Sequence, residues 1–154
     1  MKKLFLSLML LAVLMLPVQS WGVGTVTQTI GYTHNFYTIT YSWTADVADG
    51  SVPATASKWP ISGYIVKVIT NPGATAPTDN YDITLTNSDG IDVVHGELAN
   101  RDTSTSEEIV PVPSNNVTVY GGSAVAGIIT LNITNNSVNS ATGTVTVIFE
   151  RAGY

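Results

Sequence analysis

Asn87, Asp89 and Asp92 place three oxygen-bearing side chains around Gly90, and a calcium ion binds several such oxygens on a tight turn. The complete ligand pattern of an EF-hand loop is absent from the sequence. Asn and Asp side chains also bond the amides of ordinary turns, and glycine adopts a positive φ at little cost. We therefore expect a turn that needs no metal here, and calcium binding is the alternative interpretation.

The two histidines are further candidates for metal binding. His95 and Glu97 are two positions apart, so on a strand they would share a face and could supply two ligands to a metal. Gly96 between them indicates that the strand ends there, and the sequence offers no evident third ligand. We expect His95 to be a surface residue and His34 to be a loop residue.

Residues for nucleophilic or acid–base catalysis have no recognisable arrangement. Ser123 does not stand in the Gly-x-Ser-x-Gly motif, and no motif ties either histidine to an acid. Glu107 and Glu108 are adjacent, so on a strand they would point to opposite faces, whereas glycoside hydrolysis needs two carboxyl groups facing one substrate. We therefore expect a protein that is not an enzyme, with no catalytic, metal-binding or cofactor-binding residue.

Aromatic residues could form a binding surface of another kind. The segment 36–47 places Tyr37, Tyr41 and Trp43 on one face of a predicted strand, and Trp59 lies in a predicted exposed loop. Coplanar exposed rings would make a platform for a glycan or a small ligand, whereas buried rings belong to the core. We expect Tyr41 and Trp43 to be core or half-buried residues, and the platform is the alternative.

The N-terminus predicts export from the cytoplasm. Lys2 and Lys3 precede an apolar run over residues 4–16, and a small residue, Ser20, stands where a signal peptidase would cut. The run is shorter than the roughly 20 residues of a membrane-spanning helix. We expect a signal peptide at residues 1–20, a secreted or periplasmic protein with no integral membrane segment after cleavage, and a single domain at residues 21–154.

The composition excludes several classes of partner and of fold. The chain has 154 residues, a formal net charge of −5 and no cysteine. So acidic a protein is a poor ligand for nucleic acids or anionic membranes, because both draw affinity from clustered Lys and Arg. Without cysteine, no disulfide can hold the fold even in an oxidising compartment. A contiguous hydrophobic core must therefore stabilise the chain.

Period-2 alternation of apolar and polar residues predicts an all-β chain. It predicts strands at residues 25–32, 36–47, 62–70, 81–86, 91–94, 109–112, 117–120, 127–134 and 143–150. The strand 62–70 is apolar on both faces apart from Lys67, which is typical of a central strand. Residues 48–60 are expected to form a loop, and residues 97–100 a short helical turn. About nine short strands predict an antiparallel β-sandwich, with a small barrel as the alternative.

Two hairpins are expected within this sandwich. One pairs strand 81–86 with strand 91–94 through the turn at Gly90. The other pairs strand 127–134 with strand 143–150 through the polar loop 135–142. Their predicted inward-facing residues are Tyr81, Ile83, Leu85, Ile129, Leu131, Ile133, Val145, Val147 and Phe149.

The second half of the chain resembles small β-rich proteins encoded among the structural genes of tailed phages and prophages. The resemblance is carried by residues 83–93 (ITLTNSDGIDV), 98–102 (LANRD) and 137–145 (SVNSATGTV). It implies a structural or virion-associated role without catalysis. We expect a non-enzymatic structural or interaction protein outside the cytoplasm that assembles with itself or with a protein partner. The alternative is a β-sandwich module that binds a glycan or a small ligand.

Overall fold

The computed structural model describes residues 22–112 and 122–151, and these residues form nine β-strands and no helix. The strands are β1 (Thr25–Thr33), β2 (Phe36–Thr44), β3 (Thr55–Ala56), β4 (Ile61–Pro72), β5 (Asp82–Thr86), β6 (Glu107–Ile109), β7 (Ser123–Gly127), β8 (Thr130–Thr134) and β9 (Thr142–Arg151). None of the described residues belongs to a helix long and apolar enough to span a membrane. The predicted signal peptide and the predicted strand 117–120 lie outside the described residues.

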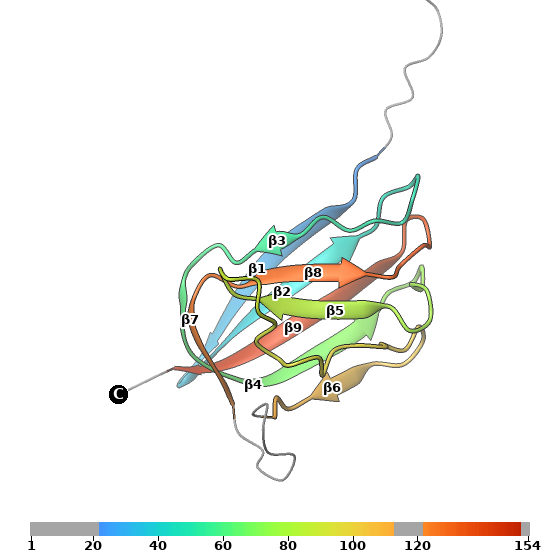
Figure 1. The fold of residues 1–154 in the computed structure, drawn as a ribbon. Coiled ribbons are helices and arrows are strands. Elements are labelled where there is room, and N and C mark those ends of the chain that lie inside the picture. Colours follow the sequence, from blue (N-terminus) through green and yellow to red (C-terminus); the bar gives the residue numbers. More distant parts are fainter. Residues whose placement is uncertain (1–21, 113–121, 152–154) are drawn as a thin grey trace, which may run out of the picture.

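The strands form two antiparallel sheets that face each other, which confirms the predicted β-sandwich (Figure 1). The larger sheet has six strands in the order β1-β2-β9-β4-β6, and β7 also pairs with β4. The smaller sheet has the order β3-β8-β5. The long strand β4 is central as expected, because it pairs with β9 on one side and with β7 and then β6 on the other.

The core lies between the two sheets and is built from the predicted inward faces. Tyr41 on β2 and Val147 on β9 are fully buried in the larger sheet. In the smaller sheet Leu85 on β5 is fully buried and Leu131 on β8 is 1% exposed. The rings of Tyr37 and Phe149 stack with centroids 4.8 Å apart. Strict alternation along β9, where every second side chain is buried, gives the larger sheet one apolar inner face. The opposite face is exposed or half-buried, and it is mostly polar, with Phe36 and Tyr64 among its exceptions.

The predicted strand at residues 91–94 is wrong. Only one bridge, between Thr86 and Asp92, continues the hairpin beyond the turn. Residues 93–98 form successive turns instead. The predicted helical turn at residues 97–100 is also wrong, because His95 (φ 58°) and Asn100 (φ 55°) adopt left-handed backbone conformations that interrupt a helix.

The second predicted hairpin is wrong as well, because the structure divides the segment 127–134. Gly127, with φ 122°, ends β7 in the larger sheet, and the chain then crosses to begin β8 in the smaller sheet. Strands β8 and β9 therefore lie in different sheets, and residues 135–142 connect the two layers. Residues 48–60 contain the two-residue strand β3, and the predicted strand 109–112 is instead β6, which ends at Ile109.

Candidate functional site

The side-chain oxygen of Asn87 in the predicted turn at Gly90 is bonded to backbone amides. Asn87 Oδ1 accepts hydrogen bonds from the amides of Asp89 (3.0 Å) and Ile91 (2.9 Å). Gly90 has φ 78°, as the turn interpretation predicts. These contacts are those of an Asx turn, in which the side-chain oxygen accepts the hydrogen bonds that a backbone carbonyl would accept in an ordinary turn.

Asp92 organises the segment that follows the turn. Its Oδ1 accepts from the amides of Leu85 (3.1 Å) and Val94 (3.2 Å), and its Oδ2 accepts from the amide of Gly96 (2.7 Å). One carboxylate thus accepts hydrogen bonds from three backbone amides. Two of these amides, those of Leu85 and Val94, belong to the two strands of the predicted hairpin. This is the physical reason why residues 91–94 do not form the predicted strand.

The histidines and acids considered for chemistry do not converge. His34 lies in the turn between β1 and β2 and is exposed, and His95 and Glu97 lie exposed in the turns after β5, not on one strand. Glu108 pairs with Lys67 at 2.9 Å, whereas Glu107 contacts Arg101 at 3.6 Å. The adjacent glutamates therefore point to opposite faces, as expected. Among the described residues, no group of three or more His, Asp or Glu side chains is placed to hold a metal ion.

Ser123 is hydrogen-bonded to the turns that follow β5 and is not presented to solvent as a nucleophile. Its hydroxyl donates to the carbonyl oxygen of Val93, and the side chain is half-buried. The bond joins β7 to the turns that follow β5. A structural role accounts for this serine.

Two of the four aromatic residues considered for a platform are in the core. Tyr41 is fully buried and Trp43 is 2% exposed, which confirms the core interpretation, and burial raises the pKa of the Tyr41 phenol above its ordinary value. Tyr37 is half-buried against Phe149, and Trp59 is 63% exposed. The Trp43 ring packs on Gly143, where the first atom of any side chain would come within 2.7 Å of the ring. These four residues therefore form no shared exposed platform.

The outer face of the larger sheet is a surface that the sequence did not single out. Apart from Gly31, Phe36, Ile148 and Glu150, its positions on β1, β2 and β9 are hydroxyl residues: Thr25, Thr27, Thr29, Thr33, Thr38, Thr40, Ser42, Thr44, Thr142, Thr144 and Thr146. The hydroxyls of Thr40 and Thr146 are hydrogen-bonded at 3.1 Å. Asn71 Nδ2 on β4 donates to Thr144 Oγ1 at 3.2 Å. The sequence did contain the signal, since these threonines are the polar half of the alternation that predicted the strands.

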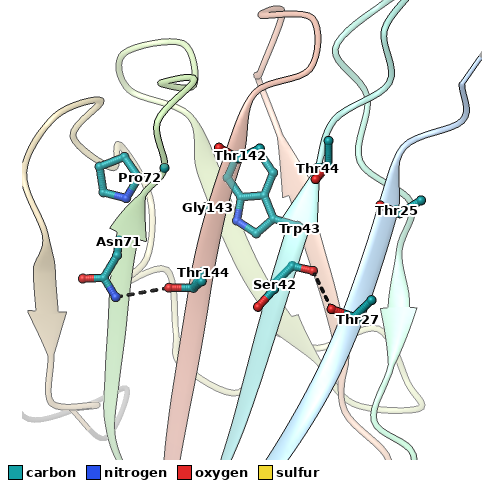
Figure 2. A pocket seen from close by; sticks show the side chains of 11 residues that line it. Thr25, Thr27, Ser42, Trp43, Thr44, Asn71, Pro72, Thr142, Gly143 and Thr144 are labelled. Carbon is teal, nitrogen blue, oxygen red and sulfur yellow. Dashed lines mark hydrogen bonds between the residues drawn. The ribbon is translucent and has the colours of Figure 1, made fainter.

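One end of this face forms a shallow depression of about 390 Å³ (Figure 2). It is lined by Thr25, Thr27, Ser42, Trp43, Thr44, Asn71, Pro72, Gly73, Thr142, Gly143 and Thr144. The lining carries many hydroxyls and one amide but no ionisable side chain, so it can exchange hydrogen bonds with a neutral polar ligand and offers no charge to an ionic one.

The other end of the outer face carries aromatic rings. Phe36 on β2 and Tyr64 on β4 are 41% and 45% exposed, and both are in register with Glu150 on the strand between them. Two inter-strand spacings separate them, which is about 10 Å. This pair was not predicted as a platform, because the order of the strands in the sheet was needed to bring the two residues to one row.

The edges of the sheets differ in how they are protected. The edge of β5 is covered by the turns that follow it: the amide of Ile83 donates to the Leu98 carbonyl (3.0 Å), and the amide of Val93 donates to the Leu85 carbonyl (2.7 Å). On the other edges β3 has two residues, β6 three and β7 five. A short or covered edge presents few unpaired backbone groups to another chain.

Strand β1 is the exception, because it is a long edge of the larger sheet. It has nine residues, TVTQTIGYT, with no charged residue and no proline. It pairs with β2 on one side, and among the described residues no other strand pairs with it. Gln28 reaches under the edge, where its amide group bonds the Ala56 carbonyl (2.6 Å) and the Lys58 amide (3.1 Å). The side chain thus ties β1 to the smaller sheet, while the backbone edge of β1 stays open.

Comparison of this chain with protein-family models, with curated protein sequences and with solved structures finds no match.

Proposed function

We propose that this chain is a non-enzymatic structural or interaction protein outside the cytoplasm, and that it assembles by adding a strand to the open edge of β1. The virion-associated role implied by the resemblance of residues 83–93, 98–102 and 137–145 belongs to the same proposal. The carrying observation is β1 itself, a nine-residue edge strand without charge or proline.

The physical argument rests on how soluble proteins treat such edges. An edge strand exposes a row of unpaired N–H and C=O groups, and proteins that must stay monomeric protect it with charged residues, proline, bulges or a covering segment. This chain covers β5 and keeps β3 and β6 short. Strand addition to an exposed edge is a common mode of protein recognition, in which backbone hydrogen bonds supply affinity. The unprotected β1 is therefore best explained as a surface that becomes paired.

Assembly is tested with the exported protein. Sedimentation velocity and light scattering should show a concentration-dependent species larger than the monomer. The control is the variant Ile30→Pro, which removes an N–H that faces the open edge. Because this N–H points away from β2, its loss leaves the β1–β2 ladder intact. A chain that stays monomeric at every accessible concentration, without a partner in its natural setting, would contradict the proposed assembly.

Export is tested separately by the intact mass of the protein recovered outside the cytoplasm. We expect the mature chain to begin at Trp21, because Ser20 stands at the predicted cleavage position. A recovered mass that includes residues 1–20 would contradict the processing step. It would leave the assembly at β1 to be judged on its own experiment.

A second candidate function is binding of a neutral glycan along the outer face of the larger sheet. It is favoured by the hydroxyl-lined depression at one end of this face and the exposed rings of Phe36 and Tyr64 at the other. Sugar rings stack on aromatic faces and exchange hydrogen bonds with hydroxyl and amide groups. Titration with neutral oligosaccharides should then give binding that Tyr64→Ala and Thr144→Val weaken. Thr134→Val on β8 in the smaller sheet, a matched exposed threonine, should leave it unchanged.

A further inference from the structure

We propose that the strand added to β1 is the β1 strand of a second copy of this chain, antiparallel and centred on a two-fold axis at Thr29. The larger sheets of the two copies then become one continuous sheet. This inference rests on the proposed function and names its partner and register.

The backbone directions of β1 follow from its hairpin with β2. Thr33 and Phe36 are partners across a two-residue turn, so they form a pair that exchanges both hydrogen bonds. Hydrogen-bonded pairs recur at every second residue, so the odd-numbered residues of β1 bond to β2. The N–H and C=O groups of the even-numbered residues, Val26, Gln28, Ile30 and Tyr32, consequently point to the open edge.

An antiparallel copy centred on Thr29 uses all of these groups. In that register Val26 lies opposite Tyr32 of the second copy, and Gln28 lies opposite Ile30. By symmetry each of these pairs occurs twice, and each is a pair that exchanges two hydrogen bonds. Shifting the register by two residues leaves part of the edge unpaired at both ends. The register centred on Thr29 is thus the one that satisfies the whole strand.

The side chains are complementary in the same register. On the inner side, the ring of Tyr32, which is 68% exposed in one copy, meets Val26 of the other and is removed from water. On the outer side threonines oppose threonines or Gly31, so the hydroxyl ladder continues across the axis. No like charges face each other, because the strand carries none.

A second copy explains this edge better than a foreign strand does. A heterologous partner is selected by pockets or charges that distinguish its side chains, and β1 carries no charged side chain for this purpose. A two-fold pair needs only self-complementarity, which a short uncharged strand of alternating threonines and apolar residues provides. Because the contact is a single strand pair, smaller than the roughly 1,200 Å² of a standard interface, we expect a reversible dimer.

The test uses the absence of cysteine from the chain, so that one introduced cysteine reports one contact. Thr29 bonds to β2, so across the new axis Thr29 and its copy form a non-hydrogen-bonded pair with Cα atoms about 4.5 Å apart, within the range of a disulfide. Under mild oxidation the mature Thr29→Cys protein should form a covalent dimer. Thr25→Cys alone should not, whereas Thr25→Cys combined with Thr33→Cys should, because these two positions face each other.

A disrupting variant completes the experiment. Thr29→Lys places two ammonium groups opposite each other on the axis, and the dimer dissociation constant should rise by more than about tenfold. Thr134→Lys on β8 is the matched control and should leave it unchanged, and circular dichroism checks that each variant is folded. If the unmodified chain is a dimer in which Thr29→Cys does not cross-link but Thr29→Lys still weakens association, the register centred on Thr29 is overturned and assembly at β1 stands. If neither variant changes the dimer, assembly at β1 is overturned as well. If the chain is monomeric throughout, both fail.

Discussion

The two sheets enclose one core, yet they satisfy the backbone groups at their edges by different means. In the larger sheet almost every backbone partner is another strand, and its one long edge, β1, is open. In the smaller sheet β5 has β8 on one side and, on the other, turns held by Asp92. Side chains can therefore close an edge where no strand is available. The edge of β5 thus has bonded backbone groups, whereas the edge of β1 presents a row of backbone groups that no described strand pairs.

The shared core gives the largest expected effect. Leu131→Ala on β8 should lower the free energy of unfolding by about 2 to 5 kcal/mol, the usual range for a buried leucine. Denaturant unfolding measures it. Val147→Ala on β9 should lower the midpoint of the same single transition, because both residues are buried at 0–1% exposure in one core.

Thr130→Ala, one position before Leu131 and half-buried, is the control and should cost far less. Equal small effects at both positions would mean that the faces of β8 are reversed, since a shift of one residue turns every side chain over. Two separate transitions would break the view that the sheets share a core.

Asp92→Ala should remove the closure of β5. We expect a loss of about 1.5 to 3 kcal/mol, the range for hydrogen bonds to a charged group, because three backbone amides lose their acceptor. Asp92→Asn keeps one oxygen and should lose less. Asp89→Ala, which removes an exposed side chain, should stay within about 0.5 kcal/mol.

The same variants decide between the turn and the calcium interpretation. Added calcium or a chelator should leave the unfolding midpoint unchanged if these oxygens serve only the backbone. A calcium-dependent rise that both Asp89→Ala and Asp92→Ala abolish would support the calcium loop, since a ligand that binds the folded state stabilises it.

Gly90→Val should cost about 1 kcal/mol or more, because a β-branched residue is strained at φ 78°. The position is open, because no neighbouring atom lies within 4 Å of the place that a β-carbon would occupy, so a steric clash contributes nothing. Gly90→Asn tolerates a positive φ and should cost less. Equal losses for both variants, measured by thermal unfolding, would point to a contact of Gly90 and not to its backbone conformation.

Tyr41→Phe should have the smallest effect at neutral pH and should raise stability by up to about 1 kcal/mol. The Tyr41 hydroxyl is buried without a hydrogen-bond partner among the described residues, so its removal relieves a desolvation cost. A loss of more than about 1 kcal/mol would show that the hydroxyl does have a partner.

The effect of pH on these tyrosines has a definite sign. Burial raises the pKa of Tyr81 to about 12 and also raises that of Tyr41. Above the ordinary tyrosine pKa of about 10 the unfolded chain loses protons that the folded chain keeps, so the free energy of unfolding falls as pH rises from about 10 to 12. Tyr81→Phe should flatten this alkaline decline.

The alternation of residue types predicted most of the larger sheet. Strands β1, β2 and β9 and the inward faces of β5 and β9 are found where period 2 placed them, because a strand buried on one face must alternate. Strand β4 is found where a run that is apolar on both faces predicted a central strand. The fold class followed from the number and spacing of these segments.

The errors share a physical cause, which is that pairing is non-local. Ile91 and Val93 alternate like strand residues, yet the Asp92 carboxylate occupies the amides they would need. Gly127 divides one apolar run between two sheets, and the two residues of β3 are too few to show a period. The candidate site was missed for the same reason, since neither the open edge of β1 nor the row of Phe36 and Tyr64 exists until the strand order is known.

Strand β9 has a consequence for the way the chain is made. It comes last of the nine strands, yet it lies between β2 and β4 in the centre of the larger sheet. A ribosome releases β2 and β4 long before the strand that joins them, so these contacts span large sequence separations and form late. During synthesis the chain holds little more than the local β1–β2 hairpin. The larger sheet can therefore close only after β9 has been released from the ribosome, and this late closure suits the export that we propose, because an incompletely folded chain can pass through a translocation channel.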